Sequence, residues 1–295
     1  MKKQASIALT LFSVFISGCT QEDATINKKT EQAPVESANP AETEQSTHDQ
    51  DQQNTENDST TATENPSTSE EYSGNNDSSS QEKVIASVKE QIQDSLPPRL
   101  PKQLPVSSKE MQLSAAIDSE SDMYRVIFLE SKKAIPINSK ELNDSAIAKP
   151  IAKIEVRKYD TAQEAESKVG YISPDDIPTN NPIDLGHSIK GYPEGGAGNK
   201  WLNWHEGRWF LQVHASNVEG NSDYLPLAKS MVGYLEQNKL PVPHQYGSVK
   251  ADVEKEKAEN NRISWQEETI VYTISNVEDP IDMLAIASHF DNTEK

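Results

Sequence analysis

The chain has 295 residues, a formal net charge of −19 and a hydrophobic content of 34%. So much charge with so few apolar residues favours a chain of which only a part folds. The acidity argues against nucleic acid as a partner, because phosphates need basic residues, and against flat binding to anionic lipid.

Residues 1–18 have the form of a secretory signal peptide. Lys2 and Lys3 precede an apolar run of about a dozen residues, shorter than the ~20 that a membrane-spanning helix needs. The run ends in Ile16-Ser17-Gly18-Cys19, which holds the only cysteine of the chain. This stretch resembles the lipobox of bacterial lipoproteins. The resemblance implies cleavage after Gly18 and attachment of lipid, such as palmitate, to Cys19; the alternative is an ordinary signal peptide with a chance cysteine.

Residues 19–82 are predicted to form a disordered acidic tether behind the lipidated cysteine. Fifteen acidic and two basic residues give 20–82 a net charge of −13, so 83–295 carry −8. The segment has no apolar period, and a coil of this length spans roughly 45 Å on average. A low-constraint spacer is the simplest interpretation of it.

Residues 83–295 are predicted to form a single domain, with 83–240 and 241–295 as candidate subdomains. Apolar residues at every fourth position predict a helix over 83–96, which Pro97 and Pro98 end. Alternating and β-branched segments predict strands over 111–117, 124–129 and 151–159. Asp160 or Thr161 is placed to cap a helix over 162–169, and 173–182 is expected to be a loop.

The next stretch is the most distinctive of the chain. Five of its twelve glycines fall between Gly186 and Gly198, and three of its four tryptophans are Trp201, Trp204 and Trp209. We expect a flexible glycine loop over 191–198, followed by aromatic strands. The charged run 250–261 is interpreted as a solvated helix end or a loop.

A unit of strand, turn, strand and helix occurs twice in the C-terminal part. The matched pairs are Trp204 with Trp265, Glu206 with Glu267, Val213 with Ile274 and Ala228 with Ala287. Asp279 followed by Pro280 predicts the start of the second helix. The predicted fold is therefore α+β: a mostly antiparallel sheet with a few packed helices and a repeated hairpin-plus-helix unit.

This combination resembles uncharacterised lipoproteins of Gram-positive bacteria, and also hairpin-plus-helix units in extracellular parts of some Gram-positive regulatory membrane proteins. The resemblance implies an anchor on the outer face of the cell membrane. It brings no catalytic residues.

Sequence patterns for catalysis are weak. His187, His205 and His214 lie near carboxylates, but the spacing of a zinc helix is absent. The glycine run is no phosphate-binding loop, and no Gly-x-Ser-x-Gly elbow occurs. We therefore expect no catalytic residues, metal or other cofactor.

Ligand binding is the better prediction. Tyr192, Trp201 and His187 are the candidate ligand-binding residues, since they lie in or beside the glycine stretch. Trp204 and Trp209, on strands, are expected to be core. The predicted function is a non-catalytic binding, sensing or assembly module at the cell envelope, whose partner is a wall glycan, a peptide or an envelope protein. The alternatives are a hydrolase acting on wall material and a chaperone-like or structural lipoprotein.

Overall fold

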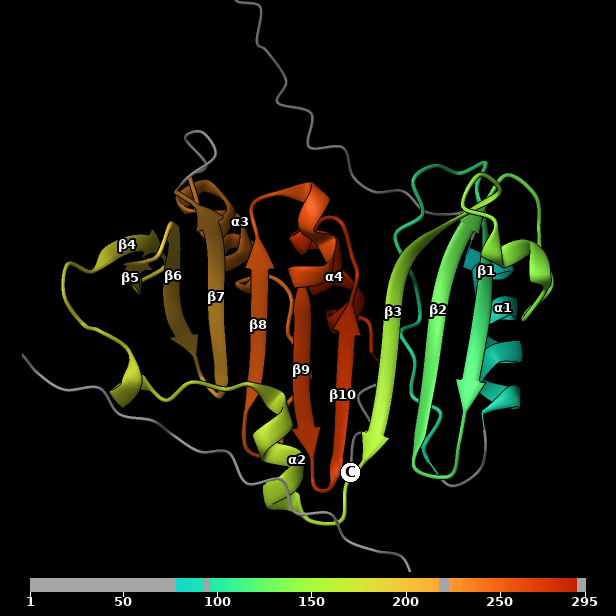
Figure 1. Cartoon of the computed structure of the whole chain (residues 1–295), viewed down its shortest axis with the longest axis horizontal. Coiled ribbons are helices and arrows are strands. Elements are labelled where there is room, and N and C mark those ends of the chain that lie inside the picture. The colour runs from blue at the N-terminus through green and yellow to red at the C-terminus, as the bar shows by residue number, and fades with distance from the viewer. Residues whose placement is uncertain (1–77, 93–95, 218–222, 291–295) are drawn as a thin grey trace, which may run out of the picture. The chain divides into compact units, whose positions relative to one another are not determined.

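The computed structural model describes residues 78–92, 96–217 and 223–290, so Cys19 and residues 19–77 of the predicted tether lie outside the described residues. The last part of the predicted tether, residues 78–82, is helical instead, because the first helix already begins at Ser78. In the described part ten strands form one sheet, in the order β1-β2-β3-β10-β9-β8-β7-β6-β5-β4 (Figure 1). The strands are β1 (Gln112–Ser119), β2 (Met123–Ser131), β3 (Ala148–Lys158), β4 (Ile183–Gly186), β5 (Ile189–Gly196), β6 (Asn199–Glu206), β7 (Trp209–Ser216), β8 (Gly247–Asp252), β9 (Arg262–Glu267) and β10 (Ile270–Ser275). Short 3-10 helices are η1 (Lys140–Asn143), η2 (Pro174–Asp176) and η3 (Lys255–Asn260).

The sheet is assembled from three runs of consecutive strands. β1 to β3 form one side, β4 to β7 form the other, and β8 to β10 lie between them, with β8 beside β7 and β10 beside β3. Every neighbouring pair is antiparallel except β7 and β8. A parallel pair needs a crossover, and helix α3 (Leu225–Leu235) provides it. The last strands of the chain therefore join its two earlier halves.

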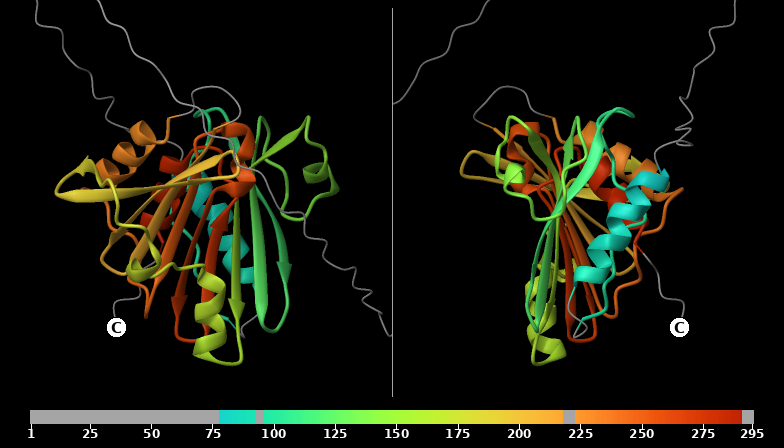
Figure 2. Two further views of the ribbon diagram at one scale, coloured as in Figure 1. Left: turned by 60° about the vertical axis from the view of Figure 1, so that its left-hand side comes forward. Right: turned by 90° about the vertical axis from the view of Figure 1, so that its right-hand side faces the viewer.

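Three helices cover one face of the sheet, which we call the helix face. These are α1 (Ser78–Gln91), α3 and α4 (Pro280–Ser288), seen together on one side of the strands in Figure 2. Alternate residues of each strand point toward them and form the main core. Fully buried examples are Val126, Ile154, Ile263, Leu211 and Trp204.

Helix α2 (Ala162–Val169) lies on the opposite face, near one end of the sheet (Figure 1). The Thr161 hydroxyl caps it by accepting from the backbone N–H of Glu164, and Gly170 ends it in a left-handed conformation. Side chains of the sheet form hydrogen bonds with both ends of this helix: Ser248 donates to the carbonyl of Val169, and Gln266 donates to the carbonyl of Ala162. Thr161, rather than Asp160, is thus the cap.

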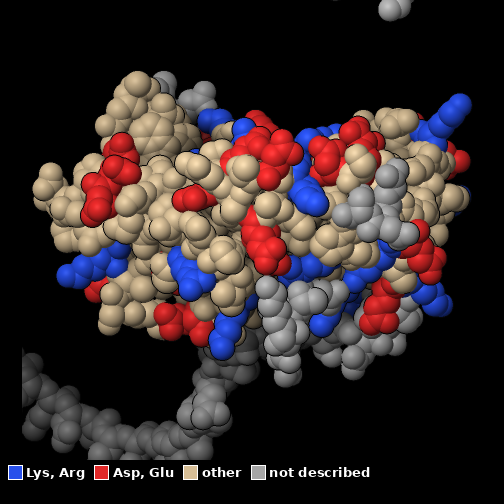
Figure 3. Space-filling model, turned by 90° about the horizontal axis from the view of Figure 1, so that it is seen from below, with Lys and Arg blue, Asp and Glu red and all other residues tan. Residues whose placement is uncertain are grey.

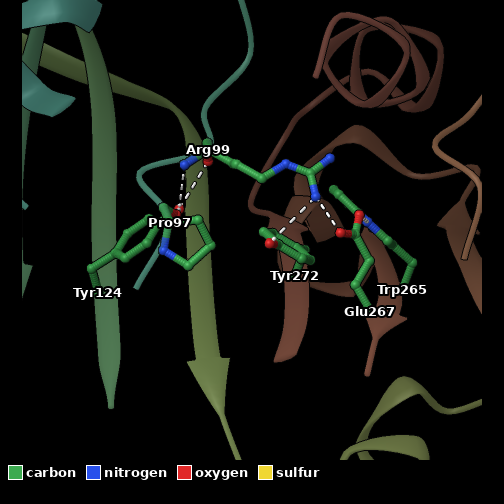
Figure 4. A network of polar contacts seen from close by, with 6 residues as sticks. All are labelled: Pro97, Arg99, Tyr124, Trp265, Glu267 and Tyr272. Carbon is green, nitrogen blue, oxygen red and sulfur yellow. Dashed lines mark hydrogen bonds and ion pairs between the residues drawn. The ribbon is translucent and has the colours of Figure 1, made fainter. Parts of the chain in front are cut away.

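A buried arginine ties the segment before β1 to the central strands (Figure 4). The Arg99 guanidinium pairs with Glu267, lies 3.4 Å from the Tyr272 hydroxyl and sits over the Tyr272 ring. Burial opposes its charge, but Tyr272 and Glu267 raise the pKa of Arg99. The Tyr124 hydroxyl donates to the carbonyl of Arg99 and accepts from its N–H. These contacts join strands β2, β9 and β10 to the same short segment.

The predicted α+β class, with a mostly antiparallel sheet and a few packed helices, is confirmed by this topology. The helix predicted over 83–96 is α1, which begins at Ser78 and ends at Gln91.

Two local predictions were wrong. Residues 191–198 do not form a loop, because 191–196 pair within β5 and only the turn at Ala197 and Gly198 has positive φ angles. The charged run 250–261 is a strand at its start, because Lys250 to Asp252 complete β8 in the middle of the sheet.

Candidate binding face of the sheet

The face opposite the helices, which we call the polar face, carries polar side chains in rows that cross the strands. Register pairing places one residue of each strand in each row, and the alternation of side chains places them all on this face. The central row runs Tyr192, Asn203, Gln212, Lys250, Arg262, Ser275 and Lys153. Residues from three distant parts of the chain thus form one line.

One end of the polar face is aromatic. Tyr192 pairs with Asn203, and Trp201, two residues before Asn203 on β6, faces the same side. Both aromatic side chains are half-buried. The Trp201 ring lies 5.6 Å from the imidazole of His214, measured between ring centroids. Two of the three predicted ligand-binding residues therefore share one face of adjacent strands.

His214 belongs to a tight hydrogen-bond network beside Trp201. Its Nδ1 lies 2.8 Å from a carboxylate oxygen of Asp252, and its Nε2 lies 2.8 Å from the side-chain oxygen of Asn199. Burial disfavours the ionised form of Asp252, but hydrogen bonds from the Glu254 backbone, Asn260 and His214 hold its pKa below the usual value. Both ring nitrogens of His214 are thus engaged by the protein itself.

His205 faces the same side as His214 but at the other end of the strands. It pairs in register with Phe210, whereas His214 pairs with Trp201, four residues along β6. Four residues of extended strand span about 13 Å. His205 Nε2 lies 2.8 Å from the carbonyl of Ile172, so it fixes the segment that crosses the polar face after α2.

His187 lies apart from the other two histidines. It sits in the turn between β4 and β5 with φ of 49°, and its Nδ1 lies 3.7 Å from Glu236 at the end of α3. Because α3 covers the helix face, this contact places the third predicted ligand-binding residue away from Tyr192 and Trp201. Within the described residues no group of three or more potential ligands could hold a metal ion.

The centre of the polar face holds three cations that we call the basic row: Lys250, Arg262 and Lys153. Lys250 and Arg262 are direct register partners on β8 and β9, and Lys153 follows on β3, beyond Ser275. Among the described residues none of the three forms an ion pair with a carboxylate. Burial, and then the charge of Arg262, lowers the pKa of Lys250.

Acidic groups near the basic row are already engaged. Glu155, the next polar-face residue on β3, accepts two hydrogen bonds from Arg125 and lies 3.9 Å from Arg157. At the lower end of the sheet, acidic and basic side chains are interspersed over the surface (Figure 3). The basic row therefore differs from Arg125 and Arg157 beside it, because among the described residues its cations have no carboxylate partner.

Two hollows lie outside the polar face. One, of about 360 Å³, lies between the β6–β7 turn, the end of α3 and residues 240–243, with Trp209 and Leu240 in its walls. Glu206 also lines it, and burial raises the pKa of this carboxyl group. The other, of about 560 Å³, has walls of both polar and apolar groups, with Glu130 and Asp282 among its lining residues.

Sequence reasoning named Tyr192 and Trp201 as candidates, and the structure places them on one face of adjacent strands; it did not single out the basic row. The alternation of 151–159 placed Lys153 on a solvated face, but nothing local pairs it with residues a hundred positions later. No family model, curated protein or solved structure matches the chain. In the described residues no helix is long and apolar enough to cross a membrane.

Proposed function

We propose that the chain is a lipid-anchored protein of the cell envelope that binds a ligand, without catalysis, across its polar face. The observation that carries the binding role is the layout of that face. Helices α1, α3 and α4 cover the other side of the sheet, while this side, with α2 at one end, presents half-buried aromatic rings beside rows of hydrogen-bonding and charged groups. Such a mixture of flat apolar and directional polar groups suits a sugar or peptide.

The anchor rests on the lipobox resemblance at Cys19. Thiol lipidation at that position tethers the domain to the outer face of the membrane, where its ligand is envelope material. Replacing Cys19 by Ala is expected to release the protein from the membrane fraction and to remove the mass of the lipid. A protein that stays in the membrane with unchanged mass contradicts the anchor.

Binding at the aromatic end is tested by thermal unfolding with wall fragments and oligosaccharides. A ligand that binds only the folded state raises the midpoint by mass action. Trp201→Ala and Tyr192→Ala should abolish this rise. Tyr224→Ala is the matched control, because this half-buried tyrosine lies at the start of α3 on the helix face. A shift that survives both polar-face changes places the ligand elsewhere.

The hydrolase alternative gains less support. The His214–Asp252 pair has the geometry that orients an imidazole, but the second ring nitrogen meets the Asn199 amide oxygen rather than a nucleophile.

The chaperone-like alternative needs an exposed apolar patch. In the described part of the chain the large exposed hydrophobic residues are Ile147 and Val242.

We also propose that β6–β7–α3 and β9–β10–α4 are two copies of one unit. Both hairpins run in the same direction on either side of β8, and the two helices pack on the same face. In each copy the indole nitrogen donates to the glutamate two residues later: Trp204 to Glu206 at 2.9 Å, and Trp265 to Glu267 at 3.3 Å. Exchanging the two turn dipeptides, 207–208 and 268–269, should leave a folded protein; loss of the cooperative transition counts against the repeat.

A further inference from the structure

The basic row groups three positive charges in a part of the chain whose net charge is negative. Residues 83–295 carry a net charge of −8, yet Lys250, Arg262 and Lys153 stand in one register row without a carboxylate partner among the described residues. Lys153 and Lys250 are half-buried, and Arg262 is exposed. The position between Arg262 and Lys153 is Ser275, a neutral hydroxyl.

This arrangement costs stability in the free protein. Like charges directly opposite each other on neighbouring strands repel, and a half-buried ammonium loses part of its hydration. The nearest acidic groups do not relieve the cost. Glu155 is held by Arg125, and Asp252 is held by His214 and Asn260. The charge is therefore open to an external anion.

Two of the three cations, Arg262 and Lys250, have close neighbours that limit their positions. The Arg262 Nε donates to Ser264, and one terminal nitrogen lies 3.4 Å from the Thr273 hydroxyl, so its guanidinium lies against the sheet. Lys250 Nζ lies 3.6 Å from the point where a Cβ on Gly170 would be, which puts the end of α2 beside it. Fixed positive groups bind an anion with less loss of side-chain entropy than mobile ones.

We propose that the basic row binds a linear anionic ligand with repeated oxyanion groups, phosphate or carboxylate, lying across strands β8, β9, β10 and β3. Neighbouring strands lie ~4.8 Å apart, so the row spans about 14 Å. Lys250 and Arg262 together fit one oxyanion group, and Lys153 fits a second one about 10 Å from Arg262. This inference rests on the proposed binding function and names the ligand class of the polar face.

The test is titration calorimetry on the full chain in non-ionic detergent, with tripolyphosphate and hexaglutamate as the two probes. At least one probe should bind, more weakly as salt is raised. The double variant Lys250→Gln with Arg262→Gln should bind at least tenfold more weakly. Lys250→Arg, which keeps the charge, should retain binding. Lys229→Gln is the matched control, since this exposed lysine lies on α3 at the helix face.

The outcomes separate this inference from the proposed function. Loss of binding in the double variant, with a thermal midpoint no lower than that of the wild type and normal binding by Lys229→Gln, supports the basic row. The probe that binds identifies phosphate or carboxylate as the ligand group. Absence of binding by both anions, or equal weakening by Lys229→Gln, overturns the inference. A neutral glycan that binds through Trp201 while both anions fail would leave the binding function standing and the basic row without this role.

Discussion

The Arg99–Glu267 pair shows how much one residue's surroundings decide the strength of an ion pair. The Arg99 side chain is 10% exposed, whereas both partners of the Lys149–Glu278 pair are at least half exposed. Water screens the exposed Lys149–Glu278 pair, so this pair adds little to stability. Removing Glu267 from the Arg99–Glu267 pair instead leaves the buried Arg99 charge without its carboxylate. The two pairs therefore make a matched comparison within one chain.

Glu267→Gln is expected to lower the free energy of unfolding by about 2–3 kcal/mol, because the Arg99 guanidinium loses its carboxylate partner in a buried site. Glu278→Gln should change it by less than about 0.5 kcal/mol. Urea unfolding followed by far-ultraviolet circular dichroism measures both. If both variants lowered the free energy of unfolding by similarly small amounts, the Arg99 network would contribute little to stability.

Lys250 should make stability depend on pH in the alkaline range. Its pKa is lowered in the folded protein by burial and by Arg262, so above that value the unfolded chain holds more protons. The free energy of unfolding then rises with pH until the lysine of the unfolded chain also loses its proton, at a pKa of about 10.4. Lys250→Gln should remove this rise and stabilise the protein at neutral pH by roughly 0.5 kcal/mol.

Thermal unfolding of wild type and Lys250→Gln from neutral to alkaline pH, in chloride buffer, checks this. The difference between the two should be largest at neutral pH and shrink as pH rises. Lys229→Gln, on exposed α3, should track the wild type throughout. A neutral-pH destabilisation by Lys250→Gln would contradict the repulsion argument.

At the scale of elements, the sheet depends on close approach between β7 and β8. Gly247 opens β8 opposite Trp209, and a Cβ there would lie 2.5 Å from the indole ring. Contact that close cannot be absorbed without moving the ring or the strand. The parallel junction of the two halves of the sheet thus requires a residue without a side chain at this position.

Gly247→Ala is expected to lower the free energy of unfolding by about 1–3 kcal/mol through this overlap. Gly233→Ala is the opposite case, because Gly233 lies inside α3 with nothing within 4 Å of its added Cβ. Alanine favours helix over glycine by about 1 kcal/mol, so this variant should be more stable. Chemical denaturation of the two variants measures both changes in the free energy of unfolding. If both variants were stabilised, or both destabilised, the steric explanation for Gly247 would be refuted.

For the described part of the molecule as a whole, the order of strands makes folding depend on the C-terminal segment. β8 to β10 lie in the middle of the sheet, so β3 and β7 meet only through them. A chain that stops at residue 240 would leave the inner edges of both strands unpaired and would lack α4 from the core.

Fragment 78–240 should therefore show no cooperative unfolding transition, whereas 78–295, which also keeps the whole of α1, should unfold in one step. Calorimetry and amide NMR spectra of the two fragments measure this. A sharp transition and a dispersed spectrum for 78–240 alone would establish that fragment as a subdomain and contradict the dependence described here.

The sequence by itself determined those features that depend on neighbours in the chain. The alternation in 151–159, a helix cap at Asp160 or Thr161, the Asp279–Pro280 helix start and the α+β class all follow from short-range periodicity and backbone hydrogen bonding. The same reasoning named Tyr192 and Trp201, beside the glycines, as candidates, and their role in binding stays a prediction. It failed at 191–198, because glycine content indicates freedom of the backbone and not whether a strand partner is present.

Only the tertiary structure decided which distant residues share a row. Lys153, Lys250 and Arg262 come together because β10 pairs with β3 and because a crossover puts β8 beside β7. It also separated His187 from Tyr192 and Trp201 by placing its turn against α3. Strand pairing across long separations depends on the closure of the whole core, and a shift of one residue would turn every side chain to the other face.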